Sequence, residues 1–169
     1  MKRFLTTKNT DHTEFIFPRF GTFRVIRVFC GLILLFLLAG CASIRPPRGV
    51  QPRTVTIETT AYCDCGQCCG WERVWWAPWR TVYSSGSNEG KPKKVGVTAS
   101  GTKARQGTIA ADRRYYPFGT VMYIPGYGYG RVEDTGSAIQ GPTRIDLFCD
   151  SHQQALQWGR RRMTINVWR

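Results

Sequence analysis

Apolar and polar residues alternate in short stretches over much of the chain beyond residue 53, which is the pattern of half-buried β-strands. In the first stretch, Val55, Ile57 and Thr59 fall on one face of an expected strand. Glycine and proline separate further β-type runs, which we expect at residues 95–98, 108–111, 120–124, 130–133, 144–148 and 164–168. Several short strands joined by glycine-containing turns are typical of a small closed barrel, so the pattern predicts a mainly β fold.

One segment of this region, Ser151–Trp158, has a helical pattern instead. Ser151 is a suitable N-cap, and Gly159 is placed to end the helix. We therefore expect one short helix near the C-terminus beside the strands.

Residues 71–94 interrupt the strand pattern with four tryptophans, Trp71, Trp75, Trp76 and Trp79, followed by a polar loop. On the interpretation that we favour, the tryptophans cap one end of a small core. On the other interpretation they form a platform for sugars, because flat aromatic faces suit the C–H faces of pyranose rings.

The first 40 residues have the layout of a signal peptide. A basic segment precedes an apolar run at residues 28–38, and about 11–13 apolar residues are too few for a typical membrane span. The run ends in Leu38-Ala39-Gly40-Cys41, which resembles a bacterial lipobox. The resemblance implies a lipoprotein, cleaved before Cys41 and carrying a diacylglyceryl group of the palmitate type on the Cys41 thiol. An uncleaved signal anchor is the alternative.

The length of 169 residues suits one domain, and the formal net charge is +13. Beyond residue 40 the chain has 18 basic and 9 acidic residues, a balance that favours polyanionic surroundings. For an exported protein these are membrane head groups and cell-wall polymers rather than nucleic acid, so we interpret Arg160-Arg161-Arg162 as a solvated face. The Pro- and Arg-rich residues 41–53 are expected to form a tether, and residues 54–169 the domain.

Three aspartates, Asp112, Asp134 and Asp146, are candidates for acid–base chemistry. Each adjoins apolar, strand-like residues, and a carboxyl group that loses hydration in such a setting becomes a better general acid. Carboxyl groups that converge on one cleft can divide into acid and base roles. Taken alone, each is more often a turn residue or a hydrogen-bonded residue at a strand end. The two histidines, His12 and His152, argue against a histidine-built metal site or a Ser-His-Asp triad.

An ordered set of motifs runs through the domain: Gly96-Val-Thr-Ala-Ser-Gly-Thr-Lys-Ala, Gly107-Thr-Ile-Ala-Ala-Asp112, Pro117-Phe-Gly-Thr, Val132-Glu-Asp134-Thr-Gly-Ser-Ala-Ile-Gln-Gly141 and Ile145-Asp146-Leu-Phe. Together they resemble the three-aspartate (3D) domain, over residues 54–169. The resemblance implies a six-stranded double-psi β-barrel, as in the membrane-bound lytic murein transglycosylase A family and in expansins. Ser137 stands where the family has a second glycine, which is a mild departure.

The resemblance also implies an activity on peptidoglycan. A lytic transglycosylase cleaves the bond between N-acetylmuramic acid and N-acetylglucosamine and leaves a 1,6-anhydromuramoyl end. Asp146 matches the family's catalytic carboxylate, and Asp134 and Asp112 match the other two aspartates. The expected substrate-binding residues are Thr98, Ser100, Tyr62 and Gly136. A non-catalytic, expansin-like module that binds the cell wall is the alternative.

Five cysteines fall in the domain, namely Cys63, Cys65, Cys68, Cys69 and Cys149. Disulfides are their commoner fate in an exported protein and are favoured here, with Cys149 as a candidate partner for one of the other four. Zinc held by thiolates is an alternative, although adjacent cysteines suit one tetrahedral ion poorly, and free thiols are another. No cofactor is otherwise expected, and a redox or metal protein built on these cysteines is a third functional alternative.

We therefore expect a monomeric protein of the cell envelope, which its lipid anchors to the periplasmic or extracytoplasmic face of a membrane. In a cell with two membranes, the residue after Cys41 favours the outer one. The expected partners are peptidoglycan glycan strands and the membrane, with no nucleic acid.

Overall fold

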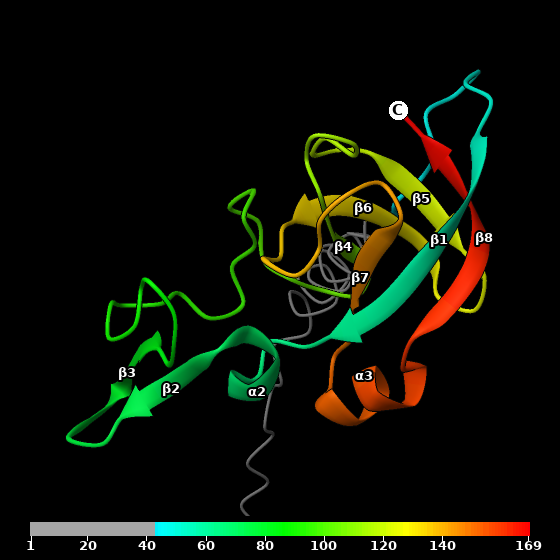
Figure 1. Ribbon diagram of the computed structural model, residues 1–169. Coiled ribbons are helices and arrows are strands. Elements are labelled where there is room, and N and C mark those ends of the chain that lie inside the picture. The colour runs from blue at the N-terminus through cyan, green and yellow to red at the C-terminus, as the bar shows by residue number, and fades with distance from the viewer. Residues whose placement is uncertain (1–42) are drawn as a thin grey trace, which may run out of the picture. The chain divides into compact units, whose positions relative to one another are not determined.

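Six strands close into a barrel in the computed structural model, which describes residues 43–169 (Figure 1). The strands follow one another around the barrel in the order β1-β7-β4-β6-β5-β8. Their bounds are β1 Arg53–Tyr62, β4 Thr108–Ala111, β5 Val121–Ile124, β6 Gly128–Asp134, β7 Arg144–Phe148 and β8 Arg161–Trp168. The predicted signal peptide and the predicted lipid attachment site, Cys41, lie outside the described residues.

Two of the neighbouring pairs in the barrel are parallel, β1 with β7 and β4 with β6, and the other four are antiparallel. Parallel neighbours require long connections between the strands, so the chain has room to build other elements outside the barrel. The barrel confirms the predicted mainly β, six-stranded fold. The double-psi arrangement of its connections stays a prediction.

Apolar side chains from all six strands fill the barrel. Within β1, Ile57 and Thr59 are buried and Val55 is half-buried, as the alternating pattern predicts. Buried side chains of the core include Ile57, Ile109, Met122, Val132, Ile145, Leu147 and Ile165. Because successive side chains on a strand point to opposite faces, the residues between these positions, such as Ala110 and Asp146, point out of the barrel.

Two helices lie outside the barrel. The predicted C-terminal helix is confirmed as α3 (His152–Trp158), where Ser151 Oγ accepts a hydrogen bond from the backbone N–H of Gln154 at 3.2 Å and Gly159 follows the last residue. The sequence pattern does not predict α2 (Gly66–Cys69), which is a single turn between β1 and the next strand. Neither of the two has the length and apolar character that crossing a membrane requires.

Strands β2 (Trp71–Val74) and β3 (Ala77–Tyr83) form a separate two-stranded sheet that stands away from the barrel (Figure 1). Three of the four tryptophans in this hairpin are exposed, with Trp75 at 91% and Trp79 at 80% of their full accessible surface. The interpretation of the tryptophan cluster as a cap on a core is therefore wrong for these side chains. They have no apolar layer of the barrel beneath them, because they project from a two-stranded sheet.

The strand expected at residues 95–98 does not form. Gly96 has a φ of +72°, in the left-handed region, and this breaks the extended backbone that a strand needs. The segment is instead a loop with one isolated bridge between Val97 and Lys103. Its role is to cover the outer face of the barrel beside β6, as the contacts of Ala99 and Ser100 described below show.

Candidate functional site

Ala110 on β4 lies in register between two of the predicted aspartates. It pairs with Asp134 on β6 and with Asp146 on β7. The pairing with β6 passes directly from Val132 to Asp134, so an irregularity at Glu133 brings Asp134 opposite Ala110. Residues in register on neighbouring strands share a face of the sheet, so both carboxyl groups leave the barrel on the same side, with Cα atoms two strand spacings, roughly 10 Å, apart.

A cleft of about 920 Å³ opens over this face of the barrel. Its walls come from the end of β1, from α2, from the base of the β2–β3 hairpin and from the loops that follow β3 and β6. The lining includes Tyr62, Cys69, Trp71, Tyr83, Lys93, Thr98, Ala110, Asp134, Gly136 and Asp146. Another cavity of about 630 Å³ lies beside the start of β1, and no aspartate or glutamate is among the residues that line it.

Burial raises the pKa of the Asp146 carboxyl, and the negative charge of Asp134 raises it further. The hydroxyl of Thr60 donates to Oδ1 of Asp146 at 2.7 Å, and together with the backbone N–H of Leu147 it acts in the opposite direction. The net result is a carboxyl group that keeps its proton to higher pH than a solvated aspartate does. This is the property that a general acid needs.

Asp134 is held by three hydrogen-bond donors. The phenol of Tyr62 donates to Oδ2 at 2.8 Å, and the backbone N–H groups of Ala99 and Thr135 each donate to Oδ1 at 2.9 Å. These donors come from β1, from the loop before β4 and from the residue directly after β6, so the carboxylate ties three segments together at the cleft. Burial and the nearby charge of Asp134 raise the pKa of Tyr62, which therefore stays a neutral donor.

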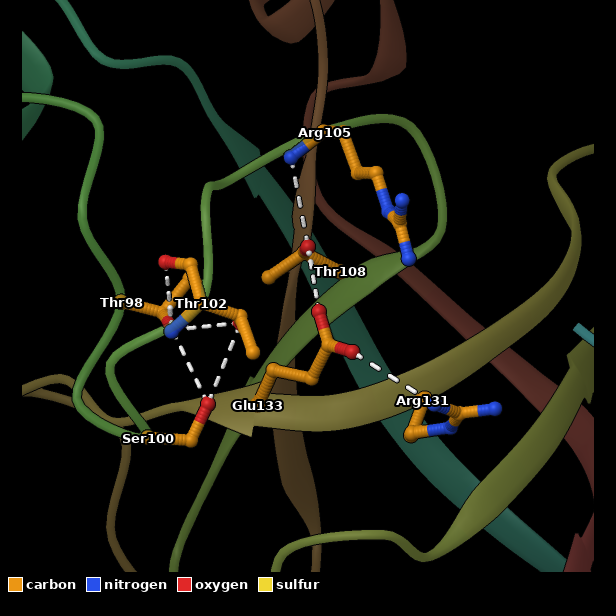
Figure 2. A network of polar contacts seen from close by, with 7 residues as sticks. All are labelled: Thr98, Ser100, Thr102, Arg105, Thr108, Arg131 and Glu133. Atoms are coloured by element: carbon orange, nitrogen blue, oxygen red, sulfur yellow. Dashed lines mark hydrogen bonds and ion pairs between the residues drawn. The ribbon is translucent and has the colours of Figure 1, made fainter. Parts of the chain in front are cut away.

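The loop that supplies Ala99 is itself fixed to β6. The backbone N–H of Ser100 donates to the carbonyl of Glu133 at 2.9 Å. Beneath it, the buried Glu133 side chain accepts a hydrogen bond from Thr108 at 3.0 Å and lies 3.9 Å from the Arg131 guanidinium (Figure 2). The position of Asp134 thus rests on a polar network between β4 and β6, which the sequence analysis did not identify.

Two of the predicted substrate-binding hydroxyls are engaged within this loop. Thr98 Oγ1 lies 3.0 Å from Ser100 Oγ and 2.9 Å from Thr102 Oγ1, and Figure 2 shows the three hydroxyl groups facing one another. Thr98 lines the cleft, whereas Ser100 is not among the lining residues. The other two predicted substrate-binding residues, Tyr62 and Gly136, both line the cleft.

Asp112 is placed differently from the other two aspartates. Its carboxylate pairs with the Arg114 guanidinium at 2.6 Å and accepts a hydrogen bond from the backbone N–H of Gly141 at 2.9 Å. These contacts hold the pKa of Asp112 well below its usual range, Arg114 being the largest cause. Asp112 is not among the residues that line the cleft, so the cleft brings together two of the three predicted aspartates.

Three cysteines and a histidine gather beside the cleft, and we refer to them as the Cys3His cluster: Cys63, Cys65, Cys68 and His152. Among the described residues the cysteines form no disulfide. Cys149 is buried outside the cluster, and Cys69 faces the cleft, where burial raises the pKa of its thiol to about 11. His152 was missed because it follows the cysteines by more than 80 residues and no spacing rule connects it to them.

One family model matches the C-terminal part of the chain. Residues 107–169 match the family model of the 3D domain, and all three aspartates lie in this segment. The chain is 37% identical over 107 residues to "Cell wall-binding protein YocH" of Bacillus subtilis (strain 168). The matched region covers 52% of this chain and 37% of that protein. It is 36% identical over 76 residues to "Putative cell wall shaping protein YabE" of the same organism, covering 43% of this chain and 18% of that protein.

The chain thus spans little more than a third of one of these relatives and less than a fifth of the other. Among solved structures, the crystal structure of MltA from E. coli matches with a TM-score of 0.35 and 21% sequence identity. That match covers 46% of this chain and 29% of MltA.

Proposed function

With a 3D domain at residues 107–169 as the premise, we propose that this protein binds and cleaves peptidoglycan. The names of two relatives, a cell wall-binding protein and a putative cell wall shaping protein, support an association with the wall. The positive charge of the chain beyond residue 40 fits an anionic polymer. The open cleft of about 920 Å³ is large enough for several sugar units of a glycan strand.

The reaction that we propose is lytic transglycosylation, with Asp146 as the catalytic residue. The protonated carboxyl gives its proton to the glycosidic oxygen of N-acetylglucosamine while the bond from that oxygen to C1 of N-acetylmuramic acid breaks. Positive charge develops at C1 and the ring oxygen. The 6-hydroxyl of the same muramoyl residue then bonds to C1 and gives its proton to the Asp146 carboxylate, which restores the starting acid. The product is a 1,6-anhydromuramoyl end.

One carboxyl group is sufficient for this reaction because the nucleophile belongs to the substrate. A hydrolase needs a second carboxyl to activate water, whereas an intramolecular hydroxyl is already positioned. Asp134 then acts as a positioning residue. Its charge raises the pKa of Asp146, and its three donors keep it directed into the cleft.

The observation that carries this proposal is the half-buried Asp146 carboxyl, which shares an open polar cleft with Asp134. The direct test is digestion of purified peptidoglycan by the full chain, with the soluble products read by mass spectrometry. Lytic cleavage gives muropeptides lighter by one water than the products of hydrolysis. Products of the hydrolytic mass would overturn the mechanism, although the wall would remain the substrate.

A second candidate function, wall binding without catalysis, is favoured by the exposed tryptophans. Trp75 and Trp79 project from the β2–β3 hairpin, whose base, at Trp71 and Tyr83, lines the cleft. Exposed aromatic faces are suited to stacking on sugar rings. If the intact chain sediments with peptidoglycan and releases no soluble product, this second function replaces the first.

We also propose that the chain works in the cell envelope with Cys41 as its lipid anchor. The Leu38-Ala39-Gly40-Cys41 motif and the apolar run before it support the anchor. Residues 43–52 precede the first strand of the barrel, so the lipid would sit about ten residues before the domain. Metabolic labelling with palmitate, abolished in Cys41→Ser, tests this assignment.

A further inference from the structure

The four side chains of the Cys3His cluster point their ligand atoms at a common centre. All four sulfur and nitrogen atoms lie within 4.8 Å of one another. The Sγ atoms of Cys63 and Cys68 are 3.7 Å apart. Nδ1 of His152 is 3.6 Å from the Sγ of Cys65 and 3.3 Å from the Sγ of Cys68.

These separations match the edges of a tetrahedral zinc site. Zinc–sulfur bonds of about 2.3 Å and zinc–nitrogen bonds of about 2.0 Å at the tetrahedral angle place two sulfurs about 3.8 Å apart, and sulfur and nitrogen about 3.5 Å apart. A disulfide would require its two sulfur atoms at about 2.05 Å. The distance of 3.7 Å between Cys63 and Cys68 therefore fits a shared ion and does not fit a direct bond.

The local fold prepares the cysteine side of this site. Cys65 is the N-cap of α2, and its Sγ accepts a hydrogen bond from the backbone N–H of Cys68 at 3.5 Å. Gly70 ends the turn in the left-handed region, with φ at +57°. The N–H group directed at this sulfur favours the thiolate form of Cys65.

The histidine side is also fixed. His152 is the first residue of α3, and the cap at Ser151 holds that end of the helix. His152 and Cys68 are 84 residues apart in sequence, so they meet only in the folded chain. The cluster is half-buried around a buried Cys63.

We propose that the Cys3His cluster binds one structural Zn²⁺ ion. Three thiolates and one imidazole fill the four positions of a tetrahedral ion, which leaves none open for catalysis. The ion would join the end of β1 to the start of α3 directly after Tyr62, the residue that holds Asp134. Binding would release the protons of the three thiols to solvent and replace them with the ion.

The two other cysteines of the described residues supply matched controls. The Sγ of Cys69 donates to the carbonyl of Cys63 at 3.1 Å, so Cys69 lies one residue from a ligand without joining the cluster. Cys149 is buried but is also outside the cluster. A site built on the adjacent pair Cys68 and Cys69 would depend on Cys69, whereas the site proposed here does not.

The experiment measures zinc by mass spectrometry in the full chain, purified under reducing conditions with no chelator and no histidine tag. We expect about one zinc per chain in the unmodified protein and in Cys69→Ser and Cys149→Ser, and loss of most of it in Cys65→Ser and His152→Gln. Substitution of Co²⁺ into the unmodified chain provides a measurement that needs no variant. We expect the visible absorption bands of tetrahedral Co²⁺, together with strong charge-transfer absorption from the thiolates.

Two results would overturn the proposal. One is a reduced, folded chain that takes up neither Zn²⁺ nor Co²⁺, with mass spectrometry of the oxidised chain showing a bond between Cys63 and Cys68. The other is zinc that is lost in Cys69→Ser but kept in His152→Gln. Peptidoglycan cleavage has no part in these readouts, so the zinc proposal and the proposed function fail independently.

Discussion

The phenol of Tyr62 donates a hydrogen bond of 2.8 Å to Oδ2 of Asp134, although the two residues are 72 positions apart in sequence. Tyr62 ends β1 and Asp134 ends β6, two strands that are not neighbours in the barrel. The contact between the Tyr62 and Asp134 side chains therefore crosses the outer faces of β7 and β4, the two strands that lie between β1 and β6. It fixes one side of the cleft relative to the other, with Asp146 between.

Removal of this hydrogen bond is the first prediction. Tyr62→Phe keeps the ring, which packs edge-on against Phe148, but removes the donor to Oδ2 of Asp134, while the two backbone donors to Oδ1 remain. We expect the free energy of unfolding to fall by about 1.5–3 kcal/mol, as for other hydrogen bonds to charged groups, and cleavage of peptidoglycan to slow. Chemical denaturation and a wall-digestion assay measure the two effects.

Tyr127→Phe is the matched control for this variant. The Tyr127 hydroxyl is also engaged, since it donates to the carbonyl of Phe148 at 2.7 Å, but it lies outside the cleft. We expect a similar loss of stability with unchanged cleavage. Equal slowing of cleavage in both variants would mean that Tyr62 acts through stability alone.

The second prediction concerns the pH dependence of cleavage. The proposed reaction starts from protonated Asp146, so its rate should fall as the pH rises through the raised pKa of that carboxyl. The negative charge of Asp134 contributes to the raised value, so Asp134→Asn should move this falling limb to lower pH. A pH–rate profile of both proteins measures the shift. A limb that stays in place would exclude electrostatic coupling between the two residues.

The third prediction concerns stability. Folding raises the pKa of the Asp146 carboxyl, so the protonated group stabilises the folded chain. This stabilisation is complete at pH values below the ordinary pKa of 3.8 and is lost as the pH rises through the raised pKa. At neutral pH the ionised Asp146 therefore costs stability. Asp146→Asn should raise the Tm at neutral pH, and the gain should shrink as the pH falls toward 3.8. Asp150→Asn, at an exposed position, is the control and should change the Tm little.

The fourth prediction addresses the exposed hairpin. Trp75→Ala and Trp79→Ala remove side chains that are 91% and 80% exposed, so folding should be unaffected. If these rings stack on sugars, each change should weaken wall binding by about 1 kcal/mol, roughly fivefold in Kd. Sedimentation with purified peptidoglycan measures the affinity. Leu156→Ala, another exposed apolar position but on α3, should bind as the unmodified chain does.

The strands and the C-terminal helix were predictable because their signals are local. The alternation of Val55, Ile57 and Thr59 marks a strand whatever its partners are, and a serine and a glycine mark the ends of α3. The hairpin was missed because its tryptophans are exposed, whereas sequence reasoning assigns such residues to a core. The strand expected at residues 95–98 failed because the left-handed backbone of Gly96 is not visible in an apolar pattern.

The site was predictable only in part. The motifs identify Asp134 and Asp146 as residues of interest, but their placement on either side of Ala110 depends on strand order and on an irregularity at Glu133. Strands of only four to seven residues are too short for their sequences to reveal either the strand order or this irregularity. His152 reaches the cysteines because β7, which precedes α3, lies parallel beside β1, which precedes the cysteines, so a contact across 84 residues was beyond any spacing rule.

The catalytic role of Asp146 is best tested by a comparison of the unmodified chain with Asp146→Asn on the same purified peptidoglycan. The release of 1,6-anhydromuropeptides and the fraction of protein that sediments with the wall are followed together. Loss of a general acid costs at least about 100-fold in rate, so we predict that Asp146→Asn still sediments but releases products at least that much more slowly. Equal product release by the two proteins would contradict the assignment of Asp146 as the catalytic residue.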